Sequence, residues 1–140
     1  DTALQQYGVR IHGDEAVAQY MKHTIPLTET SFNTEYNDMD LNVRIVENLE
    51  EAIDHINCYT THHSEAIITD EPMRATVFMN LVDCSNVYHN ASTRFTDGFE
   101  FGFGAEIGIS TQKLHARGPM GLQALTSYKY FVFGEGQVRT

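Results

Sequence analysis

The chain has 140 residues, enough for about one domain, and its apolar fraction of 41% is typical of folded globular proteins. It carries 19 acidic and 9 basic residues, for a net charge of -10. This balance disfavours nucleic acid and anionic membrane surfaces as partners, because both attract clustered Lys and Arg. Two cysteines make no disulfide framework, and no apolar run is long enough to span a membrane.

The first part of the chain predicts one strand and one helix before a polar connector. Residues 9–12 are consistent with a short strand. Asp14 is placed to cap a helix over residues 15–21. Residues 23–40 form the connector, which contains a proline.

A strand and a helix are predicted next. Residues 41–46 indicate the strand, and Asn48 follows as the cap of the helix. Glu51, three residues later, completes a pattern similar to a capping box. The apolar stripe of this helix, at helical spacing, consists of Leu49, Ala52, Ile53 and Ile56.

The same alternation then repeats. Residues 66–68 predict a short apolar strand, and Asp70 with Pro72 predicts the start of a helix, with Asp as the cap and Pro in the first turn. The expected apolar stripe of that helix consists of Met73, Val77, Phe78 and Leu81. Residues 86–90 predict a third strand.

The order strand, helix, strand, helix, strand predicts an α/β fold with a parallel sheet. A glycine-punctuated loop over residues 91–118 follows, then a short helix over 120–125 and a final strand over 128–133. A loop of more than 20 residues is unusual in a compact domain unless it is functional. It leaves the end of a strand, the place where open α/β sheets bind ligands.

The glycines of residues 102–108 superficially match a dinucleotide-binding loop. That fingerprint needs a strand directly before it and a helix directly after it, and residues 107–109 do not open a good helix. Glu106 would also face a pyrophosphate of like charge. We therefore interpret these glycines as places where the backbone approaches a ligand or a neighbouring strand.

Histidines and cysteines offer two further candidates for chemistry. His55, His62 and His63 lie near Glu65, but their spacing fits no zinc signature, so we interpret them as hydrogen-bonded structural residues and expect no metal. The two cysteines have no evident base or oxyanion donor beside them, and both are expected to be small buried residues.

The polar loop is the stronger candidate. It combines donors and charges of both signs with interleaved phenylalanines, as a small zwitterionic anion would require. Its polar members are Asn90, Ser92, Thr93, Arg94, Asp97, Glu100 and Glu106. From the residues alone, a solvated surface loop with aromatic side chains tucked beneath it is an equally good interpretation.

Three stretches of the loop, NASTRFTDG (90–98), FGFGAEIGIS (101–110) and HARGPMGL (115–122), resemble the gamma-glutamyl phosphate reductase family. A second motif, VENLEEAIDHINCYTTHHSEAI (46–67), fits the signature of that family without departure. The ending, LTSYKY (125–130) and GEGQVR (134–139), is similar to the terminus of those enzymes. The resemblance covers essentially the whole chain.

The resemblance implies an aldehyde-dehydrogenase-like fold and a reaction in proline biosynthesis. In that reaction NADPH reduces L-glutamyl 5-phosphate to the semialdehyde and phosphate is released, through a thioacyl intermediate on a cysteine. The cysteine and most of the NADPH site of the family lie upstream of the region resembled here. We therefore expect a C-terminal fragment of a cytoplasmic enzyme, with no catalytic residue of its own and no activity alone.

The resemblance also implies site residues. Glu35 stands where the wider superfamily has a glutamate that contacts the nicotinamide ribose, and Phe101 stands where it places an aromatic pocket wall. Asn90 begins the substrate loop, together with Ser92 and Thr93. Charge complementarity suggests Arg94 for the α-carboxylate or phosphate of the substrate. Either Asp97 or Glu106 would hold its α-ammonium group.

The end of the chain, residues 127–140, is expected to be an oligomerisation strand and tail, so that a homo-oligomer is implied by analogy with the superfamily. One alternative stays open. The chain would then be a stand-alone module of the same fold, which binds an amino acid or mediates oligomerisation without catalysis.

Overall fold

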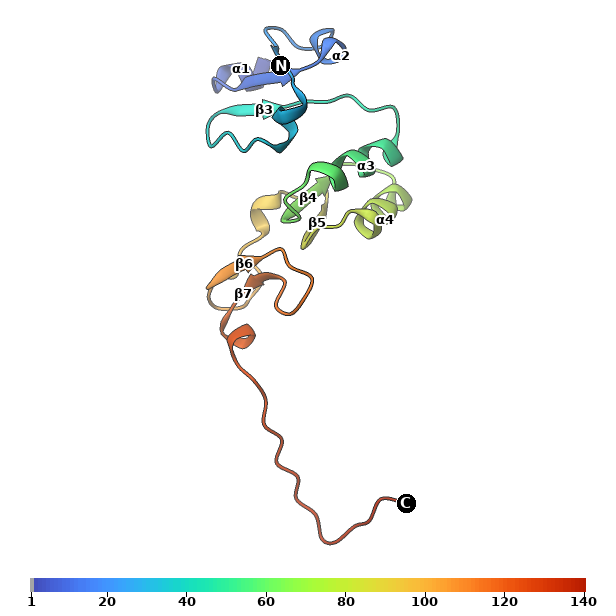
Figure 1. Cartoon of the computed structure of the whole chain (residues 1–140), viewed down its shortest axis with the longest axis vertical. Helices are drawn as coiled ribbons and strands as arrows, with labels where there is room; N and C mark the ends of the chain where they lie inside the picture. Colours follow the sequence, from blue (N-terminus) through green and yellow to red (C-terminus); the bar gives the residue numbers. More distant parts are fainter. Residues whose placement is uncertain (1) are drawn as a thin grey trace.

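The computed structural model describes residues 2–140, which form three units in series and an extended tail (Figure 1). The N-terminal unit begins with α1 (Thr2–Gln6), β1 (Arg10–Gly13) and α2 (Glu15–Ala18). It continues with β2 (Ile25–Pro26), the 3-10 helix η1 (Glu29–Asn33) and β3 (Asp40–Asn42). Its three strands are parallel in the order β2-β1-β3, with Ile11 beside Leu41.

The first helix after β1 starts as predicted but ends early. The side chain of Asp14 accepts a hydrogen bond of 3.0 Å from the backbone N–H of Val17, as an N-cap should. The helix ends at Ala18, three residues before the expected end. Val17 is fully buried against Gly13, where a Cβ atom would come within 2.5 Å of it. A side chain larger than hydrogen therefore does not fit at position 13.

The central unit contains α3 (Leu49–Tyr59), β4 (Ser64–Ile67), α4 (Pro72–Leu81) and β5 (Asn86–His89). The two strands pair in parallel, with Glu65 beside Val87. Both helices pack together over a core of buried side chains, with partly buried neighbours around it. The core consists of Ile53, Phe78, Val82 and Cys84, and the neighbours are Leu49, Ile56, Ile67 and Val87. The predicted strand–helix–strand alternation and parallel pairing are therefore confirmed for this unit.

The helix caps of the central unit confirm one prediction and correct another. The Asn48 side chain accepts from the N–H of Glu51 at 2.9 Å, but the Glu51 carboxylate accepts from the N–H of Glu47 rather than from its cap. In α4 the N-cap is Glu71, without a side-chain bond, and Asp70 lies one residue too early. Pro72 occupies the first turn, where its missing N–H costs little.

The buried face of α4 differs from the predicted stripe. Ala75 and Phe78 are buried, whereas Met73 is 80% exposed and Leu81 is 57% exposed. Met73, Val77 and Leu81 share one helix face because they are four residues apart, and nothing within residues 2–140 covers that face.

The segment expected to be one long loop contains a 3-10 helix and a two-stranded hairpin, which its glycine-rich sequence did not predict. The 3-10 helix η2 (Thr93–Phe95) lies near its start. β6 (Gly108–Ser110) and β7 (Gly118–Met120) then form an antiparallel hairpin. The helix predicted for residues 120–125 is the 3-10 helix η3 (Leu122–Leu125).

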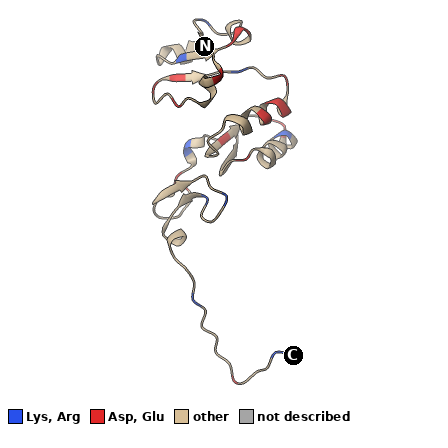
Figure 2. Ribbon diagram, viewed as in Figure 1, with Lys and Arg blue, Asp and Glu red and all other residues tan. Residues whose placement is uncertain are grey.

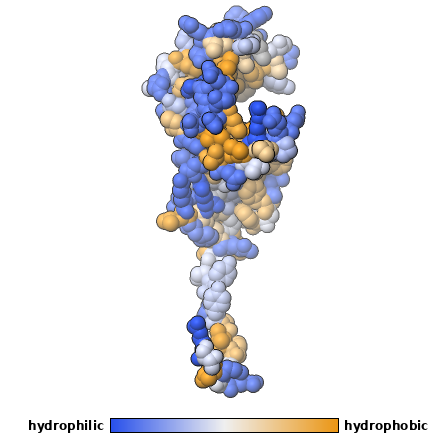
Figure 3. Space-filling view, turned by 90° about the vertical axis from the view of Figure 1, so that its right-hand side faces the viewer, coloured by the Kyte–Doolittle hydropathy of each residue, from blue (hydrophilic) through white to orange (hydrophobic). Residues whose placement is uncertain are grey.

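The final strand predicted for residues 128–133 is not formed. Residues 126–140 run extended and exposed, and Figure 3 shows them as a narrow extension with hydrophobic residues near its end. A strand needs a neighbour for its N–H and C=O groups, and the described residues offer none at this end.

Candidate functional site

A groove of about 1010 Å³ brings together three of the residues that the sequence singled out, Glu35, Thr93 and Arg94. Its lining comes from the end of η1, the connection from α3 into β4, and η2. The lining residues are Phe32, Asn33, Thr34, Glu35, Tyr59, Thr60, Thr61, His63, Ser64, Thr93, Arg94, Thr96 and Thr111. The groove therefore draws on both the N-terminal and the central unit.

The position of the groove corrects one expectation. Open α/β sheets usually bind ligands beyond the carboxyl ends of their strands. Here Thr96 bonds to Ser64, the first residue of β4, because the chain after β5 folds back over the strands. The groove accordingly lies at the amino end of β4.

The short helix η2 presents Arg94 to the groove. Ser92 caps this helix by accepting from the N–H of Arg94 at 3.2 Å. The Arg94 side chain is exposed and forms no ion pair or hydrogen bond with residues 2–140. In Figure 2, the basic ribbon at η2 stands out against the acidic α3. A free guanidinium in a chain of this negative charge is suited to an anionic ligand.

One wall of the groove is aromatic. The rings of Phe32 and Tyr59 lie 5.0 Å apart, and His55 lies 4.8 Å from each of them. The Tyr59 hydroxyl donates a short hydrogen bond to Glu29, which raises the pKa of Tyr59 to about 12. Burial, and then the nearby Arg44 charge, lower the pKa of His55. Both shifts favour the neutral forms of Tyr59 and His55.

Asn90 fixes the start of the polar loop. Its backbone has φ of 52°, a left-handed conformation that Asn tolerates better than most residues. Its side chain both accepts from the N–H of Thr69 and donates to the C=O of Thr69, each at 2.9 Å. Both ends of the amide are therefore engaged in joining the ends of β4 and β5.

The two candidate carboxylates of the loop are bound to its backbone. Asp97 accepts from the N–H groups of Phe99 at 2.8 Å and Glu100 at 3.2 Å. Glu106 accepts from the N–H of Gly98 at 2.9 Å. At Gly98 a Cβ atom would lie 2.3 Å from a backbone oxygen, so only glycine permits this close approach. Neither carboxylate lines the groove.

Phe101 lies in a second cavity, of about 520 Å³, and not in the groove. Its ring meets that of Phe103 edge to face at a centroid distance of 5.9 Å. His115, Arg117 and Tyr128 line the same cavity. Phe101 therefore lines a different space from the one that Arg94 lines, and its role as a pocket wall stays a prediction.

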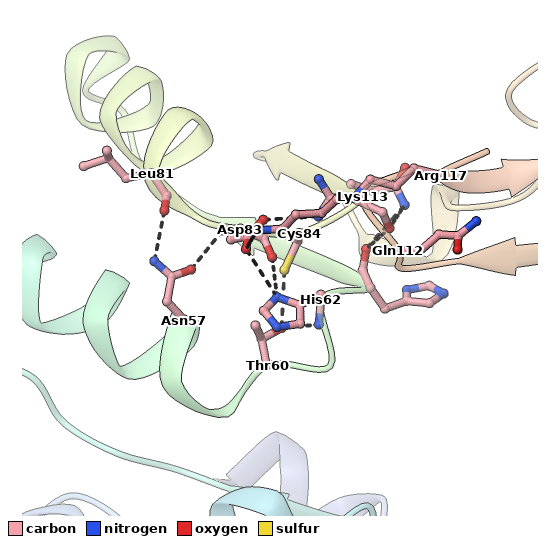
Figure 4. Close-up of polar contacts among 12 residues, drawn as sticks. Asn57, Thr60, His62, Leu81, Asp83, Cys84, Gln112, Lys113 and Arg117 are labelled. Atoms are coloured by element: carbon pink, nitrogen blue, oxygen red, sulfur yellow. Dashed lines mark hydrogen bonds and ion pairs between the residues drawn. The ribbon is translucent and has the colours of Figure 1, made fainter. Parts of the chain in front are cut away.

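Asp83 is the centre of a network of polar contacts (Figure 4), which we call the Asp83 hub. Its carboxylate pairs with Lys113 at 2.6 Å and with Arg117 at 3.3 Å, both on the β6–β7 loop. Lys113, more than Arg117, holds the pKa of this carboxyl below its ordinary value. The backbone C=O of Asp83 also lies 2.6 Å from Nδ1 of His62. The hub ties the hairpin to the end of α3, and no signal in the sequence identified Asp83.

The cysteines confirm one expectation and correct another. Cys84 is buried, its Sγ lies 3.3 Å from the Thr60 hydroxyl, and burial raises the pKa of its thiol. Cys58 is exposed, contrary to expectation. Neither cysteine lines the groove or the second cavity. A nucleophilic thiol has to reach the substrate, and neither cysteine lines a cavity where one could bind.

The histidines have structural partners, as predicted. Nδ1 of His63 lies 2.7 Å from the Ser64 hydroxyl, while the ring of His55 packs against Tyr59 without lining the groove. Within the described residues, no group of three His, Cys, Asp or Glu side chains is placed to hold a metal ion. Likewise, no helix of residues 2–140 is long and apolar enough to cross a membrane.

The glycines of residues 102–108 do not form a dinucleotide-binding loop. Gly102 and Gly104 have φ of 76° and 70°, the left-handed conformation that favours glycine. The segment leads into strand β6 and not into a helix. The close approach we expected is absent at Gly102 and Gly104, where an added Cβ atom would meet nothing within 4 Å. It is found at Gly108, where a Cβ atom would lie 3.3 Å from the Met120 side chain on the neighbouring strand.

Fold and groove together define the class of protein, an α/β domain of parallel strand–helix–strand units with an aldehyde-dehydrogenase-like fold. No family model matches the chain. It is 58% identical to gamma-glutamyl phosphate reductase of Limosilactobacillus reuteri, over 98% of the chain and 33% of the relative. It is 60% identical to the protein of that name from Thermobifida fusca, over 97% of the chain and 32% of the relative.

Solved structures agree. A crystal structure of gamma-glutamyl phosphate reductase from Thermotoga maritima matches with a TM-score of 0.92 at 49% identity, covering 99% of this chain and 34% of that one. The structure of the Saccharomyces cerevisiae reductase matches with a TM-score of 0.50 at 34% identity, over 70% of this chain and 26% of that one. The chain belongs to the gamma-glutamyl phosphate reductase family and spans about a third of the length of the relatives it matches.

Proposed function

We propose that this chain is the C-terminal portion of an NADPH-dependent reductase that converts L-glutamyl 5-phosphate to L-glutamate 5-semialdehyde and phosphate in proline biosynthesis. The observation that carries the proposal is its identity of 56–60% to proteins named gamma-glutamyl phosphate reductase over nearly its whole length. The chain spans only about a third of those proteins, so the activity belongs to a longer polypeptide.

The nucleophile of the reaction comes from outside this chain. A thioacyl route needs a thiolate that reaches the acyl carbon, and Cys84 is buried with a raised thiol pKa. Cys58 is exposed but lies on α3, outside both cavities. The residues here instead bind and orient the substrate that an upstream cysteine attacks.

Four groups of side chains share the binding and orientation of the substrate. Arg94 and Thr93 bind the anionic end of the substrate in the groove, which the free Arg94 guanidinium supports. Asn90 and Ser92 hold the loop that carries them. Further groups belong to the α-amino acid end and the pocket wall: Asp97 or Glu106 for the ammonium, and Phe101 for the wall.

Glu35 is the residue of this chain that we assign to the cofactor. Its carboxylate lines the groove, where it can accept hydrogen bonds from ribose hydroxyls. NADPH, when bound, supplies the hydride, and the remainder of the protein holds most of it. The same groove thus offers an acceptor for the ribose and a cation for the substrate.

Assays of the purified chain test whether catalysis needs the upstream part of the protein. We expect the 140-residue chain to show no NADPH oxidation with glutamyl phosphate, and the full-length reductase that contains it to show turnover. Robust turnover by the chain alone would refute the assignment of the nucleophile. Calorimetry of the chain with glutamate distinguishes the alternative of a binding module, which would bind it without the upstream part.

Substitution of Arg94 tests the site in the full-length reductase. Arg94→Ala should lower kcat/KM for glutamyl phosphate by roughly two orders of magnitude, about 3 kcal/mol for a charged hydrogen bond. Arg74→Ala is the matched control, because Arg74 pairs only with Glu71 on the exposed surface of α4. Equal kcat/KM values for the two variants would contradict the assignment of Arg94 to substrate binding.

The tail supports a proposal about assembly and location. Residues 127–140 are extended, exposed and rich in apolar side chains, as expected of a strand that pairs with another subunit. We propose a cytoplasmic homo-oligomer in which this segment joins the interface. Light scattering on the full-length reductase lacking residues 127–140 should give a smaller particle; an unchanged mass would contradict this role.

A further inference from the structure

Four side chains form a continuous hydrogen-bonded chain that ends at the groove. The Tyr88 hydroxyl lies 2.8 Å from the Thr96 hydroxyl, and that hydroxyl lies 2.7 Å from the Ser64 hydroxyl. The Ser64 hydroxyl lies 2.7 Å from Nδ1 of His63. His63, Ser64 and Thr96 line the groove, whereas Tyr88 lies on β5 outside it. This series of hydrogen bonds thus connects the sheet to a histidine in the groove.

The chemistry of the four groups favours one direction of donation. A phenol is a better donor than an aliphatic alcohol, so Tyr88 donates to Thr96, which donates to Ser64, which donates to His63. Each alcohol then accepts once and donates once. Nδ1 of His63 is the acceptor at the end of this chain, which leaves the proton of the neutral ring on Nε2. Nε2 is therefore a hydrogen-bond donor.

Donors in the groove fall into two sets. The hydroxyls of Thr34, Thr60, Ser64 and Thr96 are engaged with other protein groups. A second set has no partner among residues 2–140. It comprises the Arg94 guanidinium, Nε2 of His63, the side-chain amide of Asn33 and the hydroxyls of Thr61, Thr93 and Thr111. This second set offers one positive charge and five further donor groups, and among the described residues Glu35 is the one carboxylate that lines the same groove.

We propose that these unpartnered donors form a phosphoryl-binding subsite, in which His63 is a binding residue and Ser64, Thr96 and Tyr88 are its positioning residues. The inference rests on the proposed function. A phosphoryl group presents several anionic oxygens, which match an Arg and several N–H and O–H donors. A carboxylate, with two oxygens, would leave several of them unmatched.

The phosphoryl group is that of the acyl phosphate and not the 2′-phosphate of the cofactor. The hydride has to reach the carbon that carried the phosphate, so this phosphoryl group binds near the nicotinamide end. Glu35, assigned to the nicotinamide ribose, lines the same groove. The 2′-phosphate belongs to the adenosine end of the cofactor, remote from that ribose.

The subsite acts when the thiolate attacks. The upstream thiolate forms a C–S bond to the acyl carbon, the C–O bond to phosphate breaks, and phosphate leaves with the electron pair. Arg94 and His63 stabilise the charge that gathers on the departing oxygens. In the reverse reaction, phosphate attacks the thioester, and the same donors orient it.

The reverse reaction measures this subsite directly, because phosphate is then a substrate. In the full-length reductase we expect His63→Asn to raise the KM for inorganic phosphate about tenfold in phosphate-dependent oxidation of the semialdehyde. The KM values for semialdehyde and NADP should stay within about twofold. The adjacent His62→Asn is the matched control, since His62 does not line the groove and Asn tolerates its left-handed backbone.

Tyr88→Phe provides a second variant that leaves the groove lining intact. It removes the donor at the far end of the chain and should raise the KM for phosphate by roughly threefold, with no change for semialdehyde. An unchanged phosphate KM in both variants overturns the proposal. A rise in the KM for NADP alone assigns the subsite to the 2′-phosphate and equally overturns it.

If the proposed function itself is wrong, the experiment gives a result that differs from failure of the subsite alone. If the unsubstituted full-length protein shows no phosphate-dependent turnover, the reaction itself is wrong. Titration calorimetry with inorganic phosphate then still tests whether the subsite binds a phosphoryl group. Weaker binding to His63→Asn than to His62→Asn supports the phosphoryl subsite, and equal binding of phosphate by the two variants refutes it.

Discussion

The N-terminal and central units are held together by different forces. In the central unit, Phe78, Ile53 and Val82 form a buried apolar core. In the N-terminal unit, Arg10 donates to Asp38 at 2.7 Å and also to Asp40. Apolar burial is non-directional and is not weakened by charge screening, whereas ion pairs depend on geometry and are screened by salt. The groove draws side chains from both units, so its shape depends on both kinds of force.

Removing the largest core side chain should have the largest effect on stability. Phe78→Ala deletes a ring that is 3% exposed between α3 and β5, and should cost about 3–5 kcal/mol in free energy of unfolding. Met73→Ala on the same helix is the control, since Met73 is 80% exposed and should change stability by less than about 0.5 kcal/mol. Urea denaturation followed by circular dichroism compares the two. Similar midpoints would contradict a core centred on Phe78.

A polar clamp supports the same core and should have a smaller effect. Asn57 donates to the C=O of Leu81 and accepts from the N–H of Asp83, each at 2.9 Å, so it joins α3 to the end of α4. Asn57→Ala leaves both backbone groups without this partner and should cost about 1–3 kcal/mol. Asn80→Ala, which removes only a bond within α4, is the control. Equal denaturation midpoints for the two variants would show that the clamp does not matter.

The features that the sequence predicts correctly are local ones. Asn48 and Asp14 cap their helices because a cap needs only the next three residues. The strand predicted over residues 128–133 fails because a strand needs a partner, which a pattern within one segment cannot supply. The stripe of α4 fails for a similar reason: Met73 and Leu81 are apolar, but no described residue covers them.

The candidate site shows the same limit. Family resemblance selected Glu35 and charge complementarity selected Arg94, and the two lie 59 positions apart in the chain yet line one groove. The sequence gives no sign that Asp97 is committed to backbone N–H groups, because that depends on how the loop folds. The sequence also groups His55, His62 and His63 together as structural histidines, although of the three only His63 lines the groove. The available signal was that His62 and His63 are adjacent, because adjacent side chains point in different directions and only one of the two could then face the groove.

The charged network of the N-terminal unit predicts a pH dependence that the central core lacks. The Asp40 side chain is 5% exposed, and it bonds to Arg10 and to Nε2 of His12, the latter at 2.7 Å. Arg10, and then His12, hold the pKa of Asp40 at about 2, below its ordinary 3.8. A carboxyl with a lowered folded-state pKa stabilises the fold above its unfolded pKa, and this contribution is lost as the pH falls through the folded pKa.

The window for that loss is therefore from about pH 4 down to about pH 2. Hydrogen exchange can follow it at the N–H of Val43, which bonds to the C=O of His12, against an amide of the central unit such as the N–H of Asn90. Protection at Val43 should fall within this window and weaken in high salt, while protection at Asn90 should change less. Asp40→Asn should weaken protection at Val43 already at neutral pH and flatten its pH dependence. Asp54→Asn on the exposed side of α3 is the control, and the same acid profile in both variants would mean that Asp40 does not hold the unit that presents Glu35 to the groove.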